Sequence, residues 1–231
     1  MLKWSKNLKI LQIMTDKNWW SSDIVLIDII NFSKLDAQKQ LQIITFVTKS
    51  YTKMINKMLK DSKMSLKNLI LGYISTGDGF YCILNPKLKG YGVILGLGFN
   101  HLSEHIAKKF PYFQGLRIAI HTGIIYEFTD ILGHKNYIGD GLNDCSRYLE
   151  SKNYRTNTVI VSEEAYDTLR GFLNRYTNFN KLLIEMEFKY TAPYKFKDKH
   201  AKEKEARLVW LKKAGIINPP HINFNSILGS R

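Results

Sequence analysis

The sequence lacks any run of eighteen apolar residues, so we expect no membrane-spanning helix. Its N-terminus carries lysines but has neither the apolar stretch nor the small-residue cleavage site of a secretory signal peptide. Cysteine is also scarce, because only Cys82 and Cys145 occur, and both lie in apolar surroundings. Two such cysteines make no disulfide framework, and we expect both as small core residues. These absences predict a cytoplasmic protein.

Acidic residues are few: 20 Asp and Glu stand against 34 Lys and Arg, which gives a net charge of +14. Such an excess suggests an anionic partner, namely a nucleic acid, a nucleotide or an acidic membrane surface. A lysine-rich solvated surface explains the charge equally well. The lysines are spread along the chain, and their one local crowd, around residues 195–204, is interleaved with Asp198, Glu203 and Glu205.

The spacing of apolar residues predicts the order of the secondary structure. We expect a strand at 23–30, a helix at 37–59, a strand at 66–75, a tight turn, a strand at 80–84, a helix at 93–110 and strands at 116–122 and 123–126. This β-α-β-β-α-β order is that of an α+β, ferredoxin-like split βαβ sheet with helices on one face. Extra C-terminal strands are expected at 158–161, 182–188 and 207–211. One domain would then span 23–212, between an extension at 1–22 and a tail at 213–231.

Two aspartates stand out against this pattern. Asp28 lies inside the apolar run from Val25 to Ser33, and Asp78 lies at the hairpin tip in Gly77-Asp78-Gly79. Burying a lone carboxylate is costly. The first and third strands are neighbours in a split βαβ sheet, so the two carboxylates would meet. Carboxylates suit Mg²⁺ or Mn²⁺, although a helix cap for Asp28 and a turn role for Asp78 remain the simpler alternatives.

Four blocks of the sequence resemble those of the class III nucleotidyl cyclases, in family order, over roughly residues 23–212. The blocks are Leu26-Ile-Asp-Ile-Ile-Asn-Phe-Ser33, Gly77-Asp-Gly-Phe80, Leu116-Arg-Ile-Ala-Ile-His-Thr-Gly123 and Asn136-Tyr-Ile-Gly-Asp-Gly-Leu-Asn-Asp-Cys-Ser-Arg147. Each block alone is a weak signal, whereas four in register are specific.

The resemblance implies a role for each matching residue. Asp28, Asp78 and the Ile29 carbonyl would bind two Mg²⁺ or Mn²⁺ ions. The triphosphate would be bound by Arg117, by backbone N–H groups near Phe32 and Ser33, and by a lysine near the last strand, for which Lys199 or Lys202 could serve. Asn143 and Arg147 are four apart on one helix and share a face. They would act from the partner of a homodimer, Asn143 on the ribose and Arg147 on the transferring phosphoryl group. A surface ion pair of Arg147 with Glu150 or Asp144 is the alternative.

The residues that read a purine in this family do not match. Adenylate cyclases have a lysine and an aspartate where this chain has Ile74 and Asn136. Ile74 can neither donate nor accept a hydrogen bond, whereas Asn136 can do both. A pyrimidine is smaller than a purine, and Ile74 and Tyr137 could fill the space. The pattern thus resembles the pyrimidine cyclases of the bacterial Pycsar anti-phage system, which make cyclic UMP or cyclic CMP for a separate effector. UTP is favoured over CTP as the substrate, and no nucleic-acid partner is expected.

Two other functions remain open on the sequence. The chain could be an adenylate cyclase with atypical base contacts, or a basic nucleotide-binding module without catalytic activity. A diguanylate cyclase or polymerase palm shares the sheet, but the GG[DE]EF signature of the former is absent and neither has a counterpart of the helix with Asn143 and Arg147.

Overall fold

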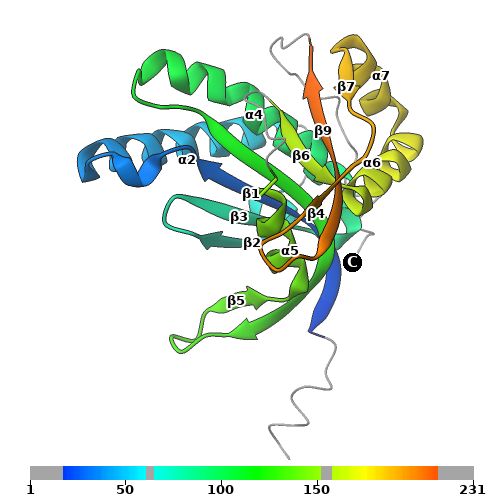
Figure 1. The fold of residues 1–231 in the computed structure, drawn as a ribbon, viewed down its shortest axis with the longest axis horizontal. Helices are drawn as coiled ribbons and strands as arrows, with labels where there is room; N and C mark the ends of the chain where they lie inside the picture. The colour runs from blue at the N-terminus through cyan, green and yellow to red at the C-terminus, as the bar shows by residue number, and fades with distance from the viewer. Residues whose placement is uncertain (1–17, 61–64, 152–157, 213–231) are drawn as a thin grey trace, which may run out of the picture.

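The computed structural model describes residues 18–60, 65–151 and 158–212. These residues form one nine-stranded sheet with helices against it (Figure 1). The first half contains β1 (Trp19–Ile29), α2 (Ala37–Leu59), α3 (Leu66–Leu69), β2 (Ile70–Ser75), β3 (Gly79–Leu84), α4 (Tyr91–Lys109) and β4 (Leu116–Thr129), with short 3₁₀ turns at Phe32–Lys34 and Pro86–Leu88. The second half contains β5 (Lys135–Ile138), α5 (Asp140–Tyr148), β6 (Val159–Ser162), α6 (Glu163–Arg175), α7 (Thr177–Glu185), β7 (Phe188–Tyr190), β8 (Tyr194–Lys197) and β9 (Glu203–Leu211).

The strand order confirms the predicted fold class. The sheet runs β2-β3-β1-β4-β6-β9-β7, with β5 paired to β4 and β8 paired to β9. Its first four strands have the split βαβ order, in which β1 lies between β3 and β4 and is antiparallel to both. The extra strands β6 to β9 extend the same sheet beyond β4.

Each face of the sheet has its own core. The larger core contains Ile27 and Ile29 of β1 with residues of α2, α4, α6 and α7. The smaller core, on the other face, contains Ile24 and Leu26 of β1 with residues of α5 such as Cys145. Side chains of a strand alternate between faces, so Asp28 shares the face of Ile24 and Leu26, where α5 packs. Both cysteines are buried, as expected.

Local chemistry explains where the main helices begin. The side chain of Asp36 accepts a hydrogen bond from the Lys39 backbone N–H at 2.9 Å and caps α2. Ser162 caps α6 in the same way through Ala165 at 3.1 Å. Among the described residues, no helix is long and apolar enough to cross a membrane.

Four sequence-based boundaries differ from the structure. The strand predicted at 182–188 is wrong except at its last residue, because α7 extends to Glu185 and β7 begins only at Phe188. Phe179 and Leu183 are buried four residues apart, and this helical spacing outweighs the apolar run. Residues 66–69 form a helical turn before β2, and 116–129 form one unbroken strand. β1 also starts at Trp19, inside the predicted extension, whereas residues 1–17 and the tail at 213–231 lie outside the described residues.

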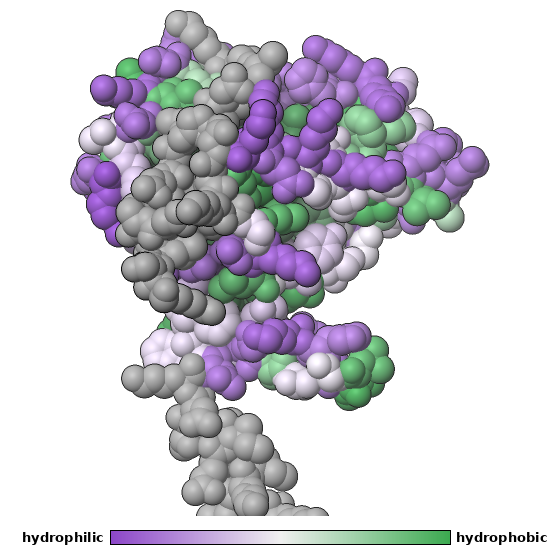
Figure 2. Space-filling view, turned by 180° about the vertical axis from the view of Figure 1, so that it is seen from behind, coloured by the Kyte–Doolittle hydropathy of each residue, from purple (hydrophilic) through white to green (hydrophobic). Residues whose placement is uncertain are grey.

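The β4–β5 hairpin projects from the body of the molecule (Figure 1). One face of β4 carries exposed apolar side chains every second residue, and the turn adds more; these are Ile124, Tyr126, Phe128, Ile131 and Leu132. Apolar surface is visible at the tip of the projecting hairpin (Figure 2). We call this set the hairpin patch. Contiguous exposed apolar surface of this kind marks an interaction site.

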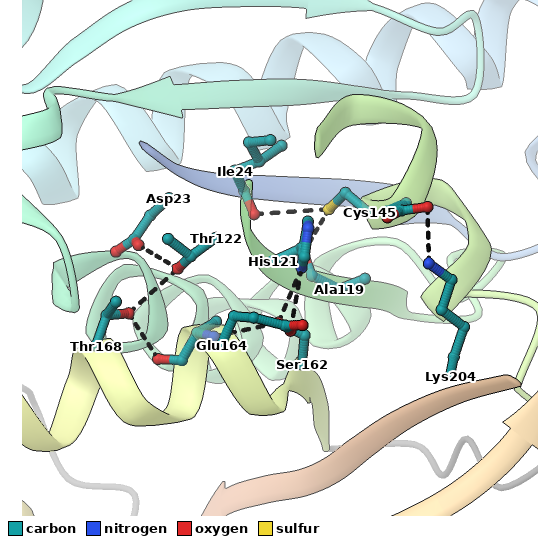
Figure 3. A network of polar contacts seen from close by, with 12 residues as sticks. Asp23, Ile24, Ala119, His121, Thr122, Cys145, Ser162, Glu164, Thr168 and Lys204 are labelled. Atoms are coloured by element: carbon teal, nitrogen blue, oxygen red, sulfur yellow. Dashed lines mark hydrogen bonds and ion pairs between the residues drawn. The ribbon is translucent and has the colours of Figure 1, made fainter. Parts of the chain in front are cut away.

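The carboxylate of Asp23 in β1 is fully buried, since the residue is 0% exposed. Its Oδ2 accepts hydrogen bonds from the backbone N–H groups of Gly90 at 2.6 Å and Gly92 at 3.0 Å, at the start of α4. Its Oδ1 accepts from the Thr122 hydroxyl at 2.7 Å, and Thr122 in turn contacts Thr168 of α6 at 3.1 Å (Figure 3). Asp23 therefore joins β1, β4, α4 and α6.

We expect Asp23→Ala to lower the free energy of unfolding by about 3 kcal/mol, since two buried N–H groups lose their acceptor. Asp23→Asn should cost about 1 kcal/mol or less, because Thr122 can accept from the amide and donate to Thr168. Burial raises the pKa of Asp23 above its ordinary 3.8. Its stabilising contribution is therefore complete below pH 3.8 and is lost as pH rises through the raised value.

Urea unfolding of the three proteins between pH 4 and pH 8 measures this effect. The wild type should lose stability relative to Asp23→Asn as the pH rises. A difference between the two that does not change with pH would contradict the raised pKa.

Candidate active site

The structure brings Asp28, Asp78 and Arg117 together at one end of β1. Asp28 pairs with Gly79 across β1 and β3, and with Arg117 across β1 and β4. The Ile29 backbone N–H donates to the Asp78 carbonyl at 2.9 Å, which fixes the hairpin tip beside β1. The predicted meeting of the two aspartates is therefore present in the fold.

A glycine is required beside Asp28. A Cβ atom at position 79 would lie 1.9 Å from the Ile27 carbonyl oxygen. Gly77 has a φ of +91°, a left-handed conformation that favours glycine. The two glycines of the Gly-Asp-Gly turn thus let Asp78 approach the end of β1.

Charge at this cluster is only partly balanced. The Asp28 side chain is 11% exposed and its Oδ2 lies 2.7 Å from both Nε and Nη2 of Arg117. Burial raises the pKa of Asp28, the Arg117 guanidinium opposes that rise, and the Asp78 carboxylate adds to it. Two carboxylates that destabilise each other's charge form a place where a cation would be stabilised.

The donor set fits a hard divalent cation. Asp28 and Asp78 offer carboxylate oxygens, and Ile29, whose backbone carbonyl is the third expected ligand, follows Asp28 in the chain. Among the described residues, no group of three or more His, Cys, Asp or Glu side chains forms a metal cage. Two carboxylates without a full cage suit Mg²⁺, which keeps waters and takes substrate phosphates as further ligands.

The turn after β1 has the features of a phosphate-binding loop. Phe32 is buried and anchors the turn, whereas Ser33 is exposed. No acceptor for the backbone N–H groups of Phe32 and Ser33 is found among the described residues. Asn31 has a φ of +56° and its amide donates to the Gln114 side chain at 2.6 Å, which holds the turn open.

Asn143 and Arg147 lie on α5, and within the described part of one chain no hydrogen bond or ion pair joins them to Asp28, Asp78 or Arg117. Asn143 is exposed. The Arg147 side chain is 18% exposed, with Nη1 2.9 Å from Asp144 and Nε 3.4 Å from Asp198. The ion pair with Asp144 is thus formed, whereas Glu150 pairs with Lys199 instead.

The lysine that shares an ion-pair partner with Arg147 in the structure is Lys204, which the sequence did not single out. Lys199 lies in the turn between β8 and β9 and its side chain is 67% exposed. Lys202 is also in that turn. Lys204, the second residue of β9, is only 14% exposed, and its Nζ lies 2.8 Å from Asp144, which also binds Arg147. The alternation of side chains in β9 would have singled out Lys204, had the start of that strand been predicted.

The three residues assigned to the base occupy different environments. Ile74 of β2 is half-buried against the smaller core, on the face of the sheet that Asp28 shares. Asn136 of β5 is half-buried, and its Oδ1 accepts from the Tyr137 backbone N–H at 2.8 Å. Tyr137 is buried, donates to the Leu71 carbonyl at 2.7 Å and packs on Trp20. Tyr137 therefore sets the spacing between β5 and β2.

Solved structures that share this fold include nucleotide cyclases. The guanylate cyclase domain from Catenaria anguillulae in complex with GTP is 15% identical, with 84% of this chain and 99% of that chain covered at a TM-score of 0.57. A crystallised guanylyl cyclase is 9% identical, with coverage of 87% and 98% and a TM-score of 0.60. This chain has the fold of a class III cyclase catalytic domain.

An adenylate/guanylate cyclase/hydrolase from Silicibacter pomeroyi shares that cyclase fold at 14% identity, with 84% and 97% coverage and a TM-score of 0.53. No protein-family model and no curated protein matches the sequence. The likeness covers nearly the whole length of these three neighbours.

Proposed function

We propose that the chain is a class III nucleotidyl cyclase that converts a pyrimidine nucleoside triphosphate, preferably UTP, to its 3′,5′-cyclic monophosphate and pyrophosphate. The observation that carries the proposal is the cluster of Asp28, Asp78 and Arg117 at the end of β1. It places two carboxylates and a cation on one face of a sheet with the cyclase fold.

In the reaction, the ribose 3′-oxygen attacks the α-phosphorus and passes its proton to water. The bond from the α-phosphorus to the oxygen that bridges to the β-phosphate breaks, and pyrophosphate leaves. Mg²⁺ or Mn²⁺, when bound, supplies charge neutralisation at the attacking and leaving oxygens. Asp28 and Asp78 would hold the ions, and Arg117 with the Phe32–Ser33 turn would hold the β- and γ-phosphates.

A homodimer completes the site in this proposal. Asn143 and Arg147 make no described contact with the carboxylate cluster of their own chain, which is the arrangement expected if they serve a partner's substrate. The hairpin patch offers apolar surface for the contact. Asn143 would orient the ribose, and Arg147 would stabilise charge at the transferring phosphoryl group. Lys204 would add positive charge from the neighbouring strand.

The base preference rests on Ile74 and Asn136. Ile74 has no side-chain polar atom that could pair with the edge of a purine. Its side chain also takes up space on the sheet face on which Asp28 lies, so less room is left for a base. Asn136 can turn its amide to offer both a donor and an acceptor. By resemblance to the Pycsar cyclases, the product would be a second messenger for a separate effector in anti-phage defence.

Incubation of the purified chain with each of the four nucleoside triphosphates and Mn²⁺, followed by chromatography of the products, tests the proposal. We expect cyclic UMP to form at least about tenfold faster than cyclic AMP, since unpaired polar edges weaken binding strongly. Conversion of ATP alone would end the pyrimidine assignment and leave the cyclase assignment standing. No product from any of the four would end both.

The double variant Ile74→Lys with Asn136→Asp refines the same assay, because it restores the purine-reading pair and should shift conversion toward ATP. Ile184→Lys is the matched control, since Ile184 is 69% exposed on α7.

A further inference from the structure

A cavity of about 300 Å³ lies between α2, α4 and α7. It opens on the helical side of the sheet, whereas Asp28 faces the side on which α5 packs. Its volume is at the lower end for small-molecule sites. The walls are apolar and rich in methionine, and include Met54, Met58, Ile94, Leu97, Leu183 and Met186.

The mouth of the cavity is cationic. Lys53 and Lys57 are exposed one turn apart on α2, and neither forms an ion pair with a described residue. His101 and His105 face them from α4, with ring centroids 5.5 Å apart. The buried Nδ1 of His101 has no hydrogen-bond partner within the described chain. Of the described residues that line the cavity, none is acidic.

The space is built into the helix packing. Gly98 of α4 lies opposite Met54, and a Cβ atom there would be 3.2 Å from the Met54 sulfur. Glycine at position 98 thus leaves room for the Met54 side chain between α2 and α4, at the cavity wall. Methionine side chains adapt to ligands of varied shape, and apolar cavities accept apolar ligands.

We propose that this cavity binds a medium-chain acyl carboxylate. The acyl chain would lie among the methionine and leucine side chains. The carboxylate would lie at the mouth, where it pairs with Lys53 and Lys57 and accepts a hydrogen bond from His101. An apolar body with one anionic end matches an apolar cavity with a cationic mouth, and a neutral or cationic ligand does not.

Isothermal titration calorimetry of the full chain with decanoate tests the site. Affinity should rise about fourfold for each methylene from hexanoate to decanoate, as expected for buried CH₂ groups. Lys53→Glu combined with Lys57→Glu should weaken decanoate binding by about tenfold. Lys49→Glu is the matched control, because Lys49 is an exposed lysine on the same helix that does not line the cavity, and it should leave binding unchanged.

A blocking variant adds a second measure. Leu102→Trp should fill the cavity and abolish decanoate binding while the thermal unfolding midpoint stays near that of the wild type. If this variant does not fold, the charge-reversal pair decides, because its two side chains are exposed.

Three results would overturn the proposal. One is the absence of saturable decanoate binding, and another is equal weakening by Lys49→Glu and by the charge-reversal pair. The third is binding only after removal of residues 213–231, which would make that segment the occupant, since it follows Leu211 at the cavity wall. None of these results bears on the cyclase assignment, which depends on the opposite face of the sheet.

Discussion

Asp78→Asn should lower the rate of cyclic nucleotide formation on the order of 10³-fold, because it removes one of the two charged ligands of the proposed metal site. The fold should persist, because the Asp78 side chain accepts only a long hydrogen bond, of 3.3 Å, from the Thr76 hydroxyl, and an asparagine oxygen can accept it as well. The Asp78 backbone carbonyl still accepts from Ile29 in the variant. Turnover of UTP under saturating Mn²⁺ measures the loss.

Asp167→Asn is the matched control for this variant. Asp167 is 72% exposed on α6, and its ion pair with Arg170 is 3.8 Å long. The activity of this control should equal that of the wild type. Unchanged activity in Asp78→Asn would remove the metal assignment and leave Asp78 as an ordinary turn residue.

Mixing two inactive variants should restore activity. Asn143→Ala should reduce turnover about 10²-fold by removing a group that orients the ribose. If Asn143 acts on the partner's substrate, a heterodimer of Asn143→Ala with Asp78→Asn has one site with both residues intact. Random exchange in an equal mixture makes half of the dimers mixed, so about a quarter of the wild-type rate should return.

The concentration dependence of this mixture tests whether the recovered activity belongs to a dimer. Recovery should fall on dilution, as the dimer dissociates, and should be absent when Asn143→Ala is mixed with a double variant that carries both substitutions. A mixture that recovers nothing at any concentration would place Asn143 and Asp78 in the same chain's site, or outside catalysis. Asn143 is exposed, so its replacement by alanine should leave the fold intact.

Much of the sheet could be predicted from the sequence because its signals are local. Alternating and continuous apolar runs placed β1, β3 and β4, and helical spacing placed α2 and α4. The strand prediction for residues 182–188 failed because a short apolar run is compatible with a strand and with the end of a helix. Only the packing of Phe179 and Leu183 in the core selects the helix. β8 was missed, since its charged side chains resemble those of a solvated loop.

The site residues also fall into those that local sequence reveals and those that only distant contacts reveal. The sequence identified Asp28 by its unusual neighbours, yet the more deeply buried carboxylate is Asp23, in the same strand. Nothing local marks Asp23, because its donors come from α4 and β4. Lys204 was passed over for Lys199 and Lys202 because β9 was expected to start only at residue 207, so the alternation that separates Lys204 from the exposed lysines was not used.

The sequence by itself determined the strand and helix order, the Gly-Asp-Gly turn and the chemical type of each site residue, because these follow from side-chain chemistry and short-range periodicity. Only the tertiary structure decided which groups meet. It placed Asp28 beside Arg117 and Asp78, Arg147 between Asp144 and Asp198, and a cationic mouth over an apolar cavity. These contacts depend on strand register and on helix packing across the sheet, and both are set by residues that lie far apart in the chain.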